Sequence, residues 1–297
     1  MFSRRLLAVV ALVILAISWG AIPLIVREDI PWQSLVASRV WLGAITLLII
    51  MGATKRLRLP ATHRRQIVAA GVLLALHWAT FFWAIKLTTV AVALAVVYLG
   101  PVAAAVLAPR FLHEAVPRRI YGALAMSFAG VVLVVAREGT ADGATSAGST
   151  WKGVGIALVS ATAVLLLMLV SKLAVNEVGA LVVTTGEMVT AAIVLSPWAG
   201  GAVRELVDNP VPLLILGVVL TGLGFLTFWT AMRELPVATV SVLMHLEPAS
   251  AVVLAMIFLD EIPDALQWLG IGMVITGGLM AARDAAAEEV VGVPANL

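Results

Sequence analysis

Long apolar runs follow one another along almost the whole chain, and they constrain its fold more than any other feature. A helix needs about 20 predominantly apolar residues to cross the hydrocarbon core of a bilayer. Charged or Pro- and Gly-rich breaks separate ten runs of about this length. We therefore predict an all-α integral membrane protein with ten transmembrane helices, at residues 6–26, 33–52, 66–85, 89–108, 118–136, 151–172, 178–197, 211–231, 237–259 and 265–282.

The composition agrees with a membrane protein. The 297 residues are 62% hydrophobic and only 12% charged, whereas soluble domains are about 25% charged. The absence of cysteine excludes disulfides, thiolate zinc sites and iron–sulfur clusters. Basic residues are spread over short loops between the apolar runs, so no nucleic-acid partner is expected. The expected partners are the lipid bilayer and a small-molecule substrate.

The basic residues also orient the predicted helices. Arg4 and Arg5 precede an apolar run that is too long for a signal peptide, so we interpret it as the first membrane helix. With the N-terminus inside, thirteen Lys and Arg residues lie in inside segments and five in outside segments. The positive-inside rule therefore predicts a multi-pass protein of the cell (inner) membrane with both termini in the cytoplasm.

Two segments of the chain resemble each other. Aligning 90–117 with 237–264 matches Pro101 to Pro248 and the F-L-x-E sequence at 111–114 to that at 258–261. Because each half would hold five spans, an odd number, the halves would insert with opposite orientation. Such inverted repeats place a substrate site near the membrane midplane and support alternating access. The predicted organisation is a first repeat at 1–140, a linker at 141–150, a second repeat at 151–285 and a tail at 286–297.

Several short motifs resemble those of one known family. The chain is similar to the EamA-type ten-helix members of the drug/metabolite transporter superfamily, on the basis of Ser18-Trp19-Gly20, Arg39, His77-Trp78-x-x-Phe81-Phe82, Pro101, Phe111-Leu112-x-Glu114, Leu246-Glu247-Pro248 and Phe258-Leu259-x-Glu261. This resemblance implies the ten-helix fold and a transporter of amino acids, other metabolites or drugs.

Charged residues inside the spans are the first functional candidates, because each is costly in lipid unless it is paired or hydrated. Arg39 and Glu187 fall at near-equivalent places in the two halves. Two interpretations fit: an ion pair that ties the halves together, or a pair of groups that bind the charged ends of a zwitterionic substrate.

Polar and aromatic residues at membrane depth complete the predicted cavity. His77 shares a helical face with Leu73 and Thr80, and His245 aligns with Tyr98. His77 could instead only be hydrogen-bonded to a neighbouring helix, whereas His245 and Tyr98 are expected in the cavity wall. The predicted substrate-binding set is Trp19, Arg39, His77, Trp78, Tyr98, Glu187, Trp229 and His245.

Two prolines and one carboxylate suggest movement and coupling. Pro101 and Pro248 each free a backbone carbonyl and favour a kink, which is either static or a hinge. Glu247 precedes Pro248 and is the candidate proton-coupling residue, because a buried carboxyl group can become protonated; the alternative is a structural hydrogen bond. Glu114 and Glu261 are expected only to cap helix ends or to form turns near the membrane surface.

Four glycines, Gly122, Gly130, Gly270 and Gly278, predict close helix contacts, either within the chain or between two copies, so both a monomer and a homodimer fit. No nucleotide-binding G-x-x-x-x-G-K-[ST] or H-E-x-x-H motif occurs. We expect no enzyme activity, no cofactor and no metal. The predicted function is a secondary transporter, an exporter of small metabolites such as amino acids. An importer or exchanger of the same fold is the first alternative, and a receptor or membrane-embedded enzyme is the second.

Overall fold

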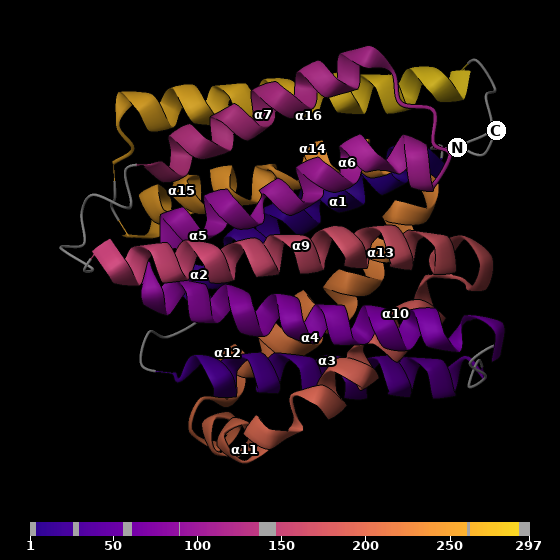
Figure 1. Ribbon diagram of the computed structural model, residues 1–297, viewed down its shortest axis with the longest axis vertical. Coiled ribbons are helices and arrows are strands. Elements are labelled where there is room, and N and C mark those ends of the chain that lie inside the picture. The colour runs from indigo at the N-terminus through magenta and orange to yellow at the C-terminus, as the bar shows by residue number, and fades with distance from the viewer. Residues whose placement is uncertain are drawn as a thin grey trace.

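The computed structural model describes residues 4–25, 30–55, 61–88, 90–136, 147–259 and 262–290. Over these ranges the chain forms a bundle of long helices that lie side by side and contains no strand (Figure 1). Many outward-facing side chains are apolar, such as Leu48 and Ile49 of α3. Helices that are apolar on every face are typical of a protein with lipid outside and packed side chains inside.

The first half of the chain supplies seven α-helices and one 3₁₀ turn. They are α1 (Arg4–Gly20), α2 (Ile22–Ile25), α3 (Trp32–Ala53), η1 (Ala61–His63), α4 (Arg64–Leu87), α5 (Val90–Val97), α6 (Leu99–Phe111) and α7 (Arg118–Ala136).

The second half begins with the longest helix and includes a π-helical segment, η3. Its elements are α9 (Ala147–Val178), α10 (Ala180–Val194), η2 (Ser196–Trp198), α11 (Ala199–Asp208), α12 (Pro210–Leu214), η3 (Ile215–Leu223), α13 (Gly224–Glu234), α14 (Val237–Met244), α15 (Leu246–Leu259) and α16 (Ala265–Val290). The start of α1 and the end of α16 lie at the same end of the bundle (Figure 1).

Seven helices in the described ranges are long and apolar enough to cross a membrane, and the chain is thus a multi-pass membrane protein. An eighth is counted if α10 and the segment after it, which are bent by 61° at a short break, form one span. The expected spans 6–26 and 118–136 correspond to α1 and α7, which are not among these helices. Ten membrane crossings therefore remain a proposal.

Two of the long spans are broken at matching places. α5 ends at Val97 and α14 ends at Met244, each four residues before a proline, Pro101 or Pro248. A proline cannot donate a hydrogen bond to the carbonyl four residues earlier, and its ring also crowds that carbonyl. The prolines thus account for both breaks, although their action as hinges remains a proposal.

α7 and α16 pack against each other along one edge of the bundle (Figure 1). A Cβ atom added to Gly130 would lie 2.6 Å from the carbonyl oxygen of Gly270, and the reverse distance is also 2.6 Å. Gly277 of α16 comes similarly close to Ala123 of α7. Of the four glycines singled out in the sequence, Gly130 and Gly270 make this contact. Gly122 has no atom within 4 Å of its position for a Cβ, so it makes no close contact within the chain.

Replacing Gly270 with alanine should lower the free energy of unfolding by about 1–3 kcal/mol, the usual cost of forcing an extra methyl group into a packed interface. The comparison is with Gly272→Ala on the same helix, where nothing lies within 4 Å of the added methyl group. Thermal unfolding of both variants in detergent measures the difference. Equal stability of the two variants would contradict the close packing of α7 and α16.

Candidate functional site

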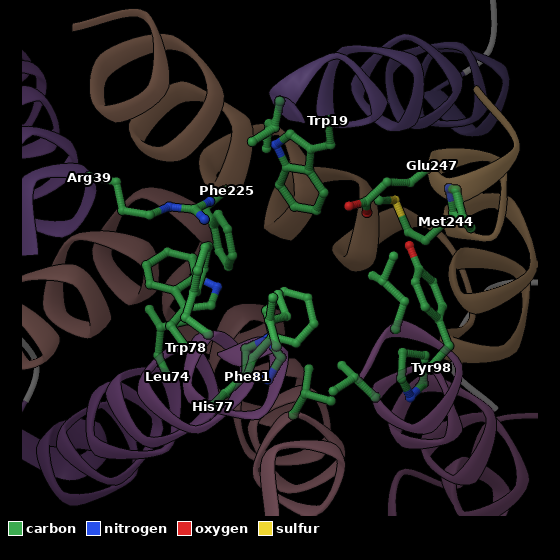
Figure 2. Close-up of a pocket in the computed structure, with 18 of the residues that line it drawn as sticks. Trp19, Arg39, Leu74, His77, Trp78, Phe81, Tyr98, Phe225, Met244 and Glu247 are labelled. Carbon is green, nitrogen blue, oxygen red and sulfur yellow. The ribbon is translucent and has the colours of Figure 1, made fainter. Parts of the chain in front are cut away.

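A cavity of about 470 Å³ lies between helices of the two halves. Its walls come from α1, α3, α4, α5 and α6 of the first half and from α9, α13, α14 and α15 of the second. Most of the lining is aromatic or aliphatic, with few charged groups. Figure 2 shows the labelled side chains surrounding an open centre.

Arg39 supplies the positive charge on one wall. It lies on α3, is buried, and donates a hydrogen bond from Nε to the Thr221 hydroxyl at 3.1 Å. Its guanidinium group lies over the Trp78 ring, 4.2 Å from the ring centroid. This cation–π contact stabilises the buried charge and holds the guanidinium plane in place. Within the described residues the Nε bond is the guanidinium's single hydrogen bond, so its terminal nitrogens are available to a ligand.

Glu247 lies on the opposite wall, in the first turn of α15. Figure 2 shows Glu247, Met244 and Tyr98 across the open centre from Arg39, with the Tyr98 hydroxyl directed toward the carboxylate. Glu247 follows the break at His245 that Pro248 causes. The break therefore places an acidic group at a helix start inside the cavity, where the helix dipole favours negative charge.

Aromatic rings separate the two charged groups. Trp19 packs against Phe225 and Phe228, with ring centroids 5.2 Å and 6.1 Å away, and Trp78 meets Phe225 edge-on at 5.1 Å. The Trp19 indole donates a hydrogen bond to the Leu220 carbonyl at 2.7 Å. These contacts fix large flat side chains around the cavity, an arrangement that suits a partly aromatic ligand.

Most of the predicted binding residues meet in this cavity. Those that line it are Trp19, Arg39, His77, Trp78, Tyr98, Trp229, Glu247, Pro101 and Pro248. His77 also has a structural partner, since its Nδ1 lies 2.8 Å from the Ser160 hydroxyl of α9. The roles of these residues in binding remain a proposal.

Arg39 and Glu187 do not form a direct ion pair, which was one of the two interpretations of the sequence. Glu187 lies on α10, is fully buried, and accepts a hydrogen bond from the Ser171 hydroxyl. The Trp229 indole lies beside the same carboxylate. Glu187 does not line the cavity. Under the repeat offset Arg39 aligns with Gly186, and Glu187 is the next residue. One residue further along a helix, the side chain points about 100° around the axis, so the two side chains face different ways.

His245 is also outside the cavity. Its Nδ1 lies 2.7 Å from the Ser127 hydroxyl of α7, and its ring packs against Tyr98 and Phe128. Of the aligned residues Tyr98 and His245, Tyr98 alone contributes to the cavity wall. The predicted position of His245 in the cavity wall is therefore wrong, because its ring is hydrogen-bonded to the neighbouring helix α7.

Thr221 is a site residue that the sequence did not suggest. It lies in the π-helical segment η3, and its hydroxyl group is the partner of Arg39. π-Helical turns occur often at functional sites, but a threonine inside an apolar run carries no signal of this role. Phe225 and Phe228 were visible only as two of many aromatic residues.

Comparison with known proteins identifies the family. The model of the EamA-like transporter family matches residues 6–136 and 151–283, and the chain belongs to this family. It is also similar to the "Uncharacterized transporter YxxF" of Bacillus subtilis (strain 168), with 26% identity over 281 residues that cover 93% of this chain and 89% of the relative. A solved structure named "Crystal structure of protein" has a TM-score of 0.78 and 20% identity, covering 97% of this chain and 100% of that one. The chain is therefore a membrane transporter of the drug/metabolite superfamily and not an enzyme.

Proposed function

We propose that this protein is a secondary transporter that exports small zwitterionic metabolites, amino acids foremost, by alternating access around the cavity. The observation that carries the proposal is the placement of Arg39 and Glu247 on opposite walls of an aromatic cavity. A carboxylate would bind the terminal nitrogens of Arg39. An ammonium group would bind Glu247 and Tyr98, and the apolar part would fill the space among Trp19, Phe225 and Trp78.

Alternating access needs two halves that can exchange roles, and the packing of α7 on α16 supports such halves. The contact of Gly130 with Gly270 has a counterpart in the contact of Ala123 with Gly277. In the alignment that matches Pro101 to Pro248, Gly130 matches Gly277 and Ala123 matches Gly270. The two contacts are therefore equivalent. A pseudo-twofold axis between the halves would produce this relation, as expected for an inverted repeat.

The proposal includes the orientation predicted from charge: ten spans in the inner membrane, with both termini in the cytoplasm. The linker at 141–150 lies mostly outside the described residues. Import or exchange by the same fold remains the alternative for direction. A monomer is favoured over a homodimer, because Gly130 and Gly270 are used in a contact within one chain.

Counterflow in liposomes tests the substrate class. Purified protein in liposomes loaded with an unlabelled aromatic amino acid should take up the labelled form well above the level of empty liposomes. The amine that lacks the carboxylate and the N-acetyl derivative that lacks the ammonium group should each support little uptake, because each leaves Arg39 or Glu247 without its partner. Uptake of the amine as fast as that of the amino acid would contradict the zwitterion proposal.

A further inference from the structure

A buried ion pair outside the cavity joins three segments of the chain. The Lys172 ammonium group of α9 lies 3.2 Å from Oε1 of Glu114, and the two side chains are 5% and 8% exposed. Glu114 belongs to the connection between α6 and α7. Its Oε2 accepts a hydrogen bond from the backbone N–H of Val237, at the start of α14, at 2.8 Å. Glu114 therefore caps a helix of the other half rather than a helix of its own.

Lys172 is held equally well on its other side. It donates hydrogen bonds to the carbonyl of Met232 and, at 2.9 Å, to that of Leu235, at the junction of α13 and α14. Both charges of the pair are thus satisfied within the protein. A buried pair of this kind is costly to break in a way that leaves one partner uncompensated. The connection between α6 and α7 is accordingly fastened to α9, α13 and α14 at one point.

This point lies directly beyond one end of the cavity. Met168, Phe228 and Ser241 line the cavity on α9, α13 and α14. In each helix the residue of the ion-pair cluster is four positions away: Lys172 after Met168, Met232 after Phe228, and Val237 before Ser241. Four residues are about one helical turn, so three helices carry the cluster one turn past the cavity.

The cavity extends in the opposite direction. Its lining includes Lys86 at the end of α4 and Trp32 at the start of α3. The end of α4 packs against Gly153 near the start of α9, far along that helix from Lys172. The two ends of the cavity are therefore different: the lining reaches the end of the bundle at Lys86, whereas the Glu114–Lys172 cluster lies beyond the other end.

We propose that the Glu114–Lys172 pair is an ionic latch that closes this end of the cavity and must separate before the cavity can open there. The inference rests on the proposed alternating access, and it assigns to Glu114 a gating role. Separation of the pair frees the connection between α6 and α7 from α9 and releases the start of α14. Opening at the latch then costs the interactions of both charged groups, so the latch favours the conformation that opens at the Lys86 end.

Thiol labelling tests the latch without any substrate. The chain has no cysteine, so Met168→Cys introduces a single thiol in the cavity wall next to the latch. A charged, membrane-impermeant maleimide is applied from the latch side of oriented proteoliposomes. The parent should be labelled slowly, and addition of Glu114→Gln should raise the labelling rate about tenfold, since at least one charge-assisted hydrogen bond is lost. Gln keeps the size and an acceptor for Val237.

Glu177→Gln is the matched control. Glu177 lies near the same end of α9 as Lys172, but it is 66% exposed and pairs with His63 at 3.0 Å, outside the ion-pair cluster. It should leave labelling unchanged. An unchanged rate in a folded Glu114→Gln variant would overturn the latch.

If that variant does not fold, a Glu114→Cys/Lys172→Cys pair is bridged by a reducible thiol cross-linker. The bridge should stop counterflow and reduction should restore it, whereas undiminished counterflow with the bridge in place would overturn the latch. Failure of the unmodified transporter in counterflow would count against the proposed function and not against the labelling result.

Discussion

Replacement of Arg39 with lysine is expected to raise the substrate concentration needed for half-maximal transport by about 100-fold, and Arg39→Ala by at least as much. Lysine keeps the charge but loses the planar contact with Trp78 and the Nε bond to Thr221. It also cannot present two parallel N–H donors to a carboxylate. Two hydrogen bonds to a charged group contribute about 3 kcal/mol together, which corresponds to about 100-fold in binding.

Counterflow measured over a range of substrate concentrations gives the concentration needed for half-maximal transport. Arg204→Ala is the control, because Arg204 is 84% exposed and its contact with Asp208 is a surface pair; its transport should equal that of the parent.

A second test concerns Glu187. Because Arg39 and Glu187 do not meet, the effects of Arg39→Ala and Glu187→Ala on unfolding free energy should add. An Arg39→Lys variant with unchanged concentration dependence would remove Arg39 from the substrate site.

Glu247→Gln is expected to abolish accumulation of substrate driven by a pH gradient, while counterflow exchange persists at substrate concentrations high enough to offset the weaker binding of the ammonium group. Glutamine keeps the size of the side chain and an acceptor oxygen for the Tyr98 hydroxyl, but it cannot take up a proton. Exchange needs only binding and movement of the loaded protein, whereas accumulation needs a second solute to move with the substrate. Glu247 stands at the break before Pro248, where a change in its charge can bias the two parts of the span.

The measurement compares uptake into liposomes with and without an imposed pH gradient. Glu187→Gln is the matched control, because Glu187 is also a fully buried carboxylate but lies outside the cavity. It should keep pH-driven accumulation in protein that remains folded. Normal pH-driven accumulation by Glu247→Gln would show that coupling, if present, uses another group. Loss of both accumulation and counterflow, even at high substrate concentration, would contradict a separate role of Glu247 in coupling.

The positions of the helices were open to prediction because apolar runs and their breaks are local features. The run expected at 33–52 is the helix Trp32–Ala53, and α16 begins at Ala265 as expected. The breaks before Pro101 and Pro248 follow from the chemistry of a single residue type. Arg39, Trp78 and Glu247 were also identified as candidates, because polar or aromatic residues at membrane depth stand out against an apolar background.

The partners of these residues were beyond prediction. A helix that is apolar on every face has no polar side to show which face packs against the protein. The contact of Glu187 with Ser171 therefore could not be predicted from the sequence. Thr221 approaches Arg39 across 182 positions and from a π-helical segment. The expected role of Glu114 as an end cap was correct in kind, but the capped helix lies 123 residues away in the other half.

The polar contacts between distant segments bear on how the chain is assembled during its synthesis. Most of those described join the first half to the second, among them Arg39 to Thr221, His77 to Ser160, Ser127 to His245 and Arg119 to Asp284. Until the helices of the second half have been inserted, the polar side chains of the first half lack these hydrogen-bonding and ionic partners. Either half alone would leave these polar groups without the partners that they have in the complete chain. The proposed repeat would then be a symmetry of the complete molecule, because the partners of early polar groups belong to helices that are inserted later.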